Sequence, residues 1–201
     1  MIFPIRYLGI PIHFRKLRNA EWRKVEERFE RRLGSSKGKH LSIGGCLTLI
    51  ISVLSSLPMY MMSFFALPKG VQKKLDYFWS RFYWQGDEQK KKYRLAKWSI
   101  LCQPKDQGGL GIHDLHIKNI ALLSKCLFKL LTKEGTWQQL LCNKYLGLKP
   151  LIQVEWKNGD SHLWSSLMKV KREFFRFGSF IVKDGTQVHF WEDKWLGNSS
   201  L

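Results

Sequence analysis

Six basic side chains stand in two short polar segments where few acidic residues balance their charge. The segments are SSKGKH at 35–40 and DEQKKKYRLAKW at 87–98, and the side chains are Lys37, Lys39, Lys90, Lys91, Lys92 and Arg94. Lysine and arginine in such segments contact the phosphate oxygens of nucleic acids without reading base sequence. We therefore predict a nucleic-acid-binding surface formed by these six residues, with simple exposure to solvent as the alternative for both segments.

The whole chain has the charge balance expected of a protein that binds a polyanion. Its 201 residues include 34 Lys and Arg against 16 Asp and Glu, which gives a formal net charge of +18. Because like charges repel one another in a compact fold, this excess points to an anionic partner. Nucleic acid is the first candidate and an anionic membrane surface is the second. A basic domain that its charge merely keeps soluble is the remaining alternative.

Motifs of common catalytic sites are missing from the sequence. It contains neither GxSxG nor HExxH, and it has no Asp-Asp pair of the kind that binds metal in a polymerase. The adjacent acids Glu192 and Asp193 are interpreted as structural. His113 and His116 flank Asp114, but no pair of cysteines completes a zinc site, and Asp114 is expected to cap a helix. We therefore expect no catalysis, no metal and no cofactor.

The longest apolar run, at 41–68, is predicted to form the centre of a mainly helical fold. Apolar residues recur at three- and four-residue steps up to Leu57, Ser42 can cap the helix, and Pro58 is expected to bend or end it. The run is long enough to cross a membrane, which stays as an alternative. Pro58 and several hydroxyl side chains favour a buried central helix instead, followed by a second apolar segment at 59–67.

Other segments have the apolar periodicity of amphipathic helices. They lie at 19–33, 68–86, 114–135 and 161–175, and a shorter helix is expected at 136–147. The inner face of the segment 114–135 is expected to begin with Ile117, and that of the shorter helix to consist of Trp137, Leu140, Leu141 and Tyr145. In the segment 68–86 the inner stripe is assigned to Val71, Leu75, Phe78 and Phe82. Its aromatic residues are expected to pack in the core, and stacking on bases is the alternative.

The two ends of the chain are predicted to be extended. Residues 1–14 form a short extended segment, because Pro4, Gly9 and Pro11 interrupt any helical pattern. Near the C-terminus, strand-like runs on either side of Asp184 and Gly185 predict a small β hairpin.

Four cysteines are scattered along the chain without a CxxC pair. Buried free thiols in a reducing compartment are the simplest interpretation. The opening sequence, MIFPIRYLGI, also lacks the pattern of a secretory signal. These features indicate an intracellular protein, with the nucleus among its candidate locations.

Several short motifs follow one another along the chain. They are YLGIPI at 7–12, LSIGG at 41–45, SVLSSLPMYMMSFF at 52–65, FYWQG at 82–86, QPKDQGGLGI at 103–112 and NIALLSK at 119–125. In this order they resemble the reverse transcriptases of plant LINE-type non-LTR retrotransposons, in the region that follows the polymerase palm. FWEDKW at 190–195 resembles the lead-in to the zinc-binding reverse-transcriptase domain of that family. The resemblance covers nearly the whole chain.

The resemblance implies helices that grip template and primer, without the catalytic carboxylates of the palm. It implies four regions: a thumb-like helical region at 1–86, a basic and glycine-rich connector at 87–112, a helical region at 113–175, and the start of a truncated zinc-binding domain at 176–201. The implied partners are RNA or an RNA·DNA hybrid and the missing polymerase palm, and zinc ligands are expected only beyond residue 201. Cys46 and Cys126 depart from the Arg and Trp usual in the family, and the first change removes one phosphate contact.

The expected fold is therefore mainly α, a thumb- and connector-like helical bundle with an extended N-terminal segment and a small C-terminal β hairpin. We expect a non-catalytic fragment that binds RNA or RNA·DNA hybrid through its basic surface, without a membrane partner. The alternative is an inactive remnant of a degraded element, whose exposed apolar surface once packed on the palm.

Overall fold

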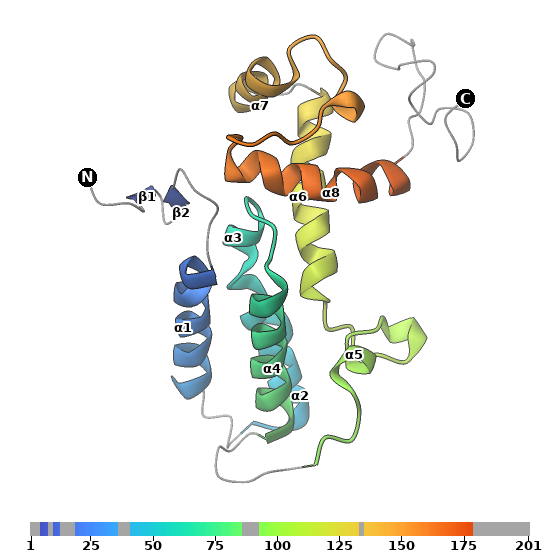
Figure 1. Cartoon of the computed structure of the whole chain (residues 1–201). Helices are drawn as coiled ribbons and strands as arrows, with labels where there is room; N and C mark the ends of the chain where they lie inside the picture. Colours follow the sequence, from blue (N-terminus) through green and yellow to red (C-terminus); the bar gives the residue numbers. More distant parts are fainter. Residues whose placement is uncertain are drawn as a thin grey trace. The chain divides into compact units, whose positions relative to one another are not determined.

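The computed structural model describes residues 5–7, 10–12, 19–35, 41–85, 93–132 and 135–178. These residues are mainly helical, as predicted, and the chain divides into two compact units, unit 1 (Met1–Ala121) and unit 2 (Leu122–Leu201). Figure 1 labels their helices and strands. The division into units does not test the four regions expected from the motifs, which stay a prediction.

Two short strands pair near the N-terminus. Strands β1 (Ile5–Tyr7) and β2 (Ile10–Ile12) run antiparallel, with Arg6 opposite Pro11. The extended segment expected at the N-terminus is thus a small two-stranded sheet. The β hairpin predicted near the C-terminus lies outside the described residues.

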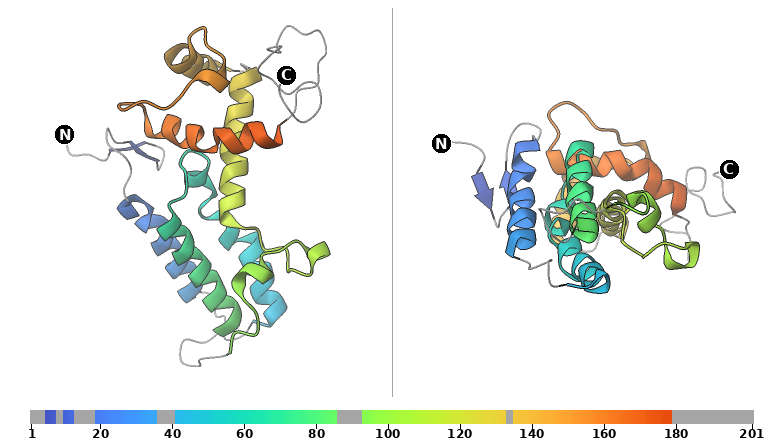
Figure 2. Two further views of the ribbon diagram at one scale, coloured as in Figure 1. Left: turned by 45° about the vertical axis from the view of Figure 1, so that its right-hand side comes forward. Right: turned by 90° about the horizontal axis from the view of Figure 1, so that it is seen from below.

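Helix α4 (Lys69–Gln85) is the centre of unit 1, because both α1 (Asn19–Ser35) and α2 (Ile43–Ser52) pack against it. Figures 1 and 2 show the three helices side by side. The rings of Phe29 and Trp79, with centroids 6.1 Å apart, join α1 to α4 in the core. Trp79 and Phe82 therefore pack in the core, as predicted for the aromatic residues of this helix, whereas Tyr77 is exposed.

The prediction that Phe78 belongs to the inner stripe of α4 is wrong. Val71, Leu75 and Phe82 are buried, but Trp79 rather than Phe78 completes the buried face. Both choices keep helical spacing, so periodicity alone does not separate them. Phe78 is only partly buried, and the ammonium of Lys74 lies 5.8 Å from the centre of its ring.

The apolar run at 41–68 is broken earlier than the sequence predicted. Helix α2 ends at Ser52, and it is followed by the turn η2 (Leu54–Ser56) and the single helical turn α3 (Met59–Met62). The hydroxyl groups of Ser52 and Ser55 each donate to the carbonyl four residues earlier, at 2.6 Å. Such bonds compete with the helical ladder, so the helix ends before Pro58 is reached.

The predicted start of this run is confirmed, because Ser42 Oγ accepts a hydrogen bond from the Gly45 N–H at 3.1 Å. The run is also less deeply buried than expected, with Leu41 and Ile43 exposed. Among the described residues, no helix combines the length and the apolar character that crossing a bilayer requires.

A buried asparagine holds the turn that follows α3. Asn119 is 3% exposed. Its Oδ1 accepts from the Leu67 N–H at 2.8 Å, and its Nδ2 donates to the carbonyls of Met62 and Phe65 at 2.8 and 3.0 Å. Backbone groups thus satisfy both ends of this amide, as a buried polar side chain requires.

Helix α6 (Leu115–Thr132) begins where the sequence predicted. Asp114 Oδ1 accepts from the backbone N–H groups of His116 and Ile117, at 2.6 and 3.2 Å, and so caps the helix. The assignment of Ile117 to the buried face is wrong. The polar Asn119 lies on that face in its place, and Ile117 is exposed.

The motif QPKDQGGLGI forms a tight turn between α5 (Trp98–Leu101) and α6. Gly108 has a φ of 82°, and a Cβ on Gly109 would lie 1.9 Å from the carbonyl oxygen of Gln103. The Leu110 N–H donates to the Leu101 carbonyl at 2.9 Å and closes the turn. These glycines are therefore required by the backbone itself.

Unit 2 combines helices with irregular segments. After α6 come α7 (Thr136–Leu141), the π-helical turn η4 (Cys142–Leu146), the turn η5 (Leu151–Gln153) and α8 (His162–Phe177). The last helix was expected to begin at Ser161, and Ser161 caps α8, because its Oγ accepts from the Trp164 N–H at 3.3 Å.

The core of unit 2 contains two stacked rings. Tyr145 lies 4.4 Å from Trp164, and the two planes differ by 7°. Trp137 and Leu140, which the sequence assigned to the inner side of α7, are exposed, whereas Leu141 is buried. The six residues of α7 give way to the wider π-helical turn, so a uniform helical period does not describe this segment.

Candidate nucleic-acid interface

Of the six residues predicted to contact phosphates, the structure describes Arg94. Lys37, Lys39 and residues 90–92 lie outside the described residues. Arg94 is exposed, and its guanidinium lies 5.9 Å from the centre of the Tyr77 ring on α4. The predicted basic segment therefore meets helix α4 at an aromatic side chain.

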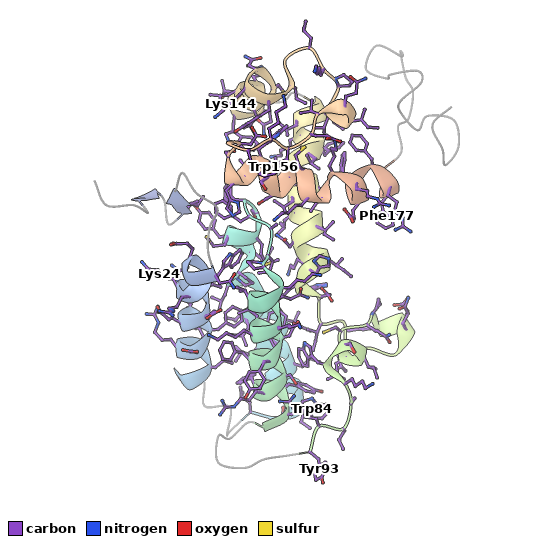
Figure 3. The ribbon with its side chains drawn as sticks, in the orientation of Figure 1. Lys24, Trp84, Tyr93, Lys144, Trp156 and Phe177 are labelled. Atoms are coloured by element: carbon purple, nitrogen blue, oxygen red, sulfur yellow. The ribbon has the colours of Figure 1, made fainter. Side chains whose placement is uncertain are left out.

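Tyr77 belongs to a small surface that we call the Tyr77 patch, formed by Lys73, Tyr77 and Arg94. Tyr77 is 49% exposed, and Lys73, also exposed, stands four residues before it on α4. Side chains four residues apart lie on the same face of a helix, so Lys73 and Tyr77 are neighbours. Next to Arg94 in the chain, Tyr93 is 92% exposed, and Figure 3 shows its side chain pointing away from α4.

The cations of the Tyr77 patch differ from their neighbour Lys74. Lys74 donates to a carboxylate oxygen of Glu26 on α1 at 2.5 Å, so part of its charge is compensated. The outer face of α1 is likewise mixed, with exposed Glu27 and Glu30 between exposed arginines. Phosphate binding is therefore better served by the Tyr77 patch than by α1.

A half-buried carboxylate lies on α4 directly before Tyr77. Burial, followed by repulsion from Asp114, raises the pKa of Asp76 from its ordinary 3.8 to about 6. An interaction with the Trp98 side chain acts in the opposite direction and lowers this pKa. The indole N–H of Trp98 is nevertheless buried without a partner in ordinary hydrogen-bond geometry.

The thiol of Cys102 adds to the same cluster. Its pKa is raised to about 12, first by burial and then by the charges of Asp76 and Asp114. A thiol with this pKa stays protonated at neutral pH and is a poor nucleophile. The thiol of Cys102 is therefore unsuited to nucleophilic chemistry at neutral pH.

The histidines beside Asp114 stay apart from any metal-ligand set. His113 and His116 are exposed, and Asp114 is engaged as the cap of α6. Within the described part of the chain, no three His, Cys, Asp or Glu side chains are placed to hold a metal ion together. Cys46, which replaces the Arg usual in the resembling family, is buried and has no access to phosphate.

Sequence reasoning missed the exposure of Tyr77. The helical spacing from Lys73 was visible, but Tyr77 lies among six aromatic residues at 77–84, and all were expected to pack. Only the position of α1 and α2 against α4 decides which of these rings face solvent. Of these six rings Tyr77 is the most exposed, and the Arg94 guanidinium lies beside it.

No protein-family model matches the chain. It is 32% identical over 196 residues to the "Putative ribonuclease H protein At1g65750" of Arabidopsis thaliana, an alignment that covers 96% of this chain and 32% of that protein. The chain thus spans about a third of the length of this relative.

A second relative from Arabidopsis thaliana is covered almost completely. The "Uncharacterized mitochondrial protein AtMg00310" is 32% identical over 143 residues, which make up 70% of this chain and 93% of that protein. Relatives of these two kinds are typical of retrotransposon-derived plant proteins. The chain belongs to the family of the uncharacterized mitochondrial protein AtMg00310.

Proposed function

We propose that this chain is a non-catalytic fragment related to LINE-type non-LTR reverse transcriptases and that it holds RNA or an RNA·DNA hybrid. The observation that carries the proposal is the exposed pair of Arg94 and Tyr77, beside Lys73, in a chain of net charge +18. Cations next to exposed rings are the combination with which proteins grip nucleic acids without reading their sequence. The polymerase palm of a longer protein is the proposed second partner.

A matched pair of variants tests where the nucleic acid binds. Lys90, Lys91 and Arg94 are changed to Gln in one variant, and Arg23, Lys24 and Arg31 of α1 in the other, so each loses three positive charges. Binding of a fluorescent RNA·DNA hybrid is measured by anisotropy over a salt series. Each lost phosphate contact reduces the magnitude of the negative slope of log affinity against log salt by about 0.7 to 0.9.

The first variant is expected to bind at least about tenfold more weakly at low salt. The slope of its log affinity against log salt should be less steep, by about 2 to 3 in magnitude. The α1 variant should change affinity less than about threefold, because acidic neighbours already compensate its charges. Equal losses in the two variants would mean that only net charge matters and would overturn the assignment to this surface.

The absence of catalysis is tested separately. With added Mg²⁺ or Mn²⁺ the purified chain is expected neither to extend a primer on an RNA template nor to cut the RNA strand of a hybrid. Both reactions need carboxylates that hold divalent ions against phosphate. Primer extension, or cleavage that copurifies with the chain, would contradict the proposal.

An inactive remnant is the second candidate, and exposed apolar side chains favour it. Leu140, Leu148 and Phe177 of unit 2 are all more than half exposed. If they once packed on a missing domain, the chain should bind a hydrophobic dye strongly and self-associate. It should then bind no nucleic acid even at low salt. A monomer with little dye binding would exclude this alternative.

A further inference from the structure

A loop of unit 2 carries an exposed aromatic side chain among lysines. We call residues 147–161, which lead into α8, the Trp156 loop. Trp156 is 49% exposed, and Lys149 and Lys157 of the same loop are exposed, as is Lys144 just before it. Figure 3 labels Trp156 and Lys144. This combination was not among the contacts predicted from the sequence.

Polar side chains fix the backbone on both sides of Trp156. Before it, Lys171 of α8 donates to the carbonyls of Ile152 and Val154, at 2.9 and 2.7 Å. After it, a carboxylate oxygen of Asp160 accepts from the Lys157 N–H at 2.8 Å. A large ring that stays exposed on a fixed backbone is a preorganised contact surface, because little order remains to be imposed on binding.

The end of the loop is anchored to the core of unit 2. The Ser161 N–H donates to the Tyr145 hydroxyl at 3.3 Å, and the Tyr145 ring is stacked on the buried Trp164. Tyr145 comes from the π-helical turn that also carries Lys144. The same turn therefore supplies one cation of the surface and one anchor of the loop.

Each of the two acidic residues of the loop has a partner. Asp160 holds the turn at Lys157, and the charge of Glu155 acts on the ammonium of Lys171, whose pKa it raises against the larger lowering by burial. Within residues 122–132 and 135–178 there are nine Lys and Arg against three Asp and Glu. Residues 144–161 carry three lysines, Lys144, Lys149 and Lys157, against the two acids Glu155 and Asp160, so the positive excess at the loop itself is small.

We infer that the Trp156 loop binds single-stranded nucleic acid, with a base stacked on Trp156 and flanking phosphates on Lys149 and Lys157. The inference rests on the proposed function and adds the type of strand. A ring can stack on the face of a base only where no neighbouring base pair covers that face, so an unpaired strand is the ligand. The polar neighbours Glu155 and Asn158 make insertion of the same ring into a bilayer unfavourable.

The test compares two exposed tryptophans of one unit in the full chain. Trp156→Ala removes the proposed platform, and Trp137→Ala is the control, because Trp137 is also exposed but its neighbours are Thr136 and Gln138. Trp156→Phe retains a ring. Binding of a fluorescent single-stranded RNA and of an RNA·DNA hybrid is measured by anisotropy, with thermal unfolding as the check on folding.

Trp156→Ala is expected to weaken binding of single-stranded RNA about 5- to 20-fold, which corresponds to the loss of roughly 1–1.8 kcal/mol of base stacking, and binding of the hybrid less than twofold. Trp156→Phe should recover most of the loss, and Trp137→Ala should behave as the unmodified chain. Equal single-strand affinity in Trp156→Ala and Trp137→Ala would overturn this inference alone. If Trp156→Ala lost binding to phosphatidylserine vesicles and kept its RNA binding, the inference would be overturned in favour of a membrane surface.

Failure of the underlying function looks different. If the unmodified chain binds neither the single strand nor the hybrid at low salt, both proposals fall together. If it binds the hybrid and not the single strand, the proposed function stands and the Trp156 loop has no part in it.

Discussion

Each of the two units is stabilised internally by a different kind of contact. Unit 1 is built by helix packing, with α4 between α1 and α2 and a buried asparagine at the turn after α3. Unit 2 depends more on side chains that fix irregular backbone, such as Lys171 and the Tyr145 hydroxyl. Packed helices leave few aromatic rings uncovered, whereas a loop fixed by side chains can hold a ring in solvent. This positively charged chain therefore presents exposed rings in two settings, Tyr77 on a packed helix and Trp156 on a loop.

Both units carry a basic excess, which is 14 Lys and Arg against seven Asp and Glu in the described part of unit 1, but the charge is unevenly distributed. Helix α1 of unit 1 carries five Lys and Arg against four Asp and Glu, and one of these acids pairs with Lys74. The described part of unit 2 has a threefold excess of basic residues. A large net charge alone thus does not locate a binding surface. Unbalanced charge beside an exposed ring does so better.

The largest expected effect concerns the asparagine of unit 1. Asn119→Ala removes the hydrogen bonds from Asn119 to the Leu67 N–H and to the Met62 and Phe65 carbonyls. A hydrogen bond of this kind contributes about 1 kcal/mol, so the loss of three should lower the free energy of unfolding by about 3 kcal/mol. Urea unfolding followed by circular dichroism measures the change.

The control for Asn119→Ala is Asn143→Ala, because Asn143 is exposed and lies in unit 2. It should change the free energy of unfolding by less than about 0.5 kcal/mol. If both variants lose the same stability, the buried amide has no special part in unit 1.

An intermediate effect is expected in unit 2. Lys171→Met removes the two hydrogen bonds to the Ile152 and Val154 carbonyls while keeping most of the side-chain volume. Hydrogen exchange should accelerate in the Trp156 loop, and the free energy of unfolding should fall by about 1–2 kcal/mol. Lys169→Met, at an exposed position of the same helix, serves as the control. Unchanged exchange in the loop would show that its backbone is fixed by other groups.

The smallest predicted effect is an increase in the free energy of unfolding, and it concerns Asp76 of unit 1. The pKa of Asp76 is about 6 in the folded chain against an ordinary 3.8, so the folded state holds this proton more tightly than the unfolded state. The stability that protonated Asp76 contributes is full below pH 3.8 and is lost as the pH rises through 6.

Asp76→Asn should therefore raise the free energy of unfolding at pH 7.5, by about 1 kcal/mol because solvent partly screens this carboxylate. Between pH 4 and about 6.5 the variant should also lose part of the pH dependence of unfolding. Asp106→Asn, an exposed acid of the same unit, is the control. A variant less stable than the unmodified chain at pH 7.5 would show that the Asp76 charge is favourable.

Local signals in the sequence were sufficient for the ends of several helices. Ser42 and Asp114 were expected to cap helices and Ser161 to begin one, and each of the three accepts a backbone hydrogen bond of a cap. A cap depends on residues within one turn, so the neighbouring sequence contains the required information. The mainly helical fold follows from the same local patterns.

Contacts between distant segments were not predictable in the same way. Ile117 and Trp137 were placed on buried faces by periodicity, yet both are exposed, because the positions of other elements decide which side of a helix is covered. The bonds of Asn119 and Lys171 reach backbone groups far away in the chain, at 62–67 and 152–154. No local pattern identifies such partners.

In the candidate interface too, the local features could be predicted from the sequence and the contacts between distant segments could not. Arg94 was selected from local composition, whereas Tyr77 beneath it lies on another element and became visible only in the fold. The Trp156 loop was likewise hidden, since its exposed ring depends on Lys171 from the following helix. Charge could be read from the sequence, but the exposed rings could not.

The central claim is that this chain holds a polyanionic strand through phosphate contacts. The most direct test is the affinity of the full chain for an RNA·DNA hybrid, measured by filter binding over a series of salt concentrations. If most of the six predicted lysine and arginine residues contact phosphates, log affinity should fall with log salt at a slope of about −4 to −5. An affinity that does not change with salt, or no binding at the lowest salt, would contradict the claim.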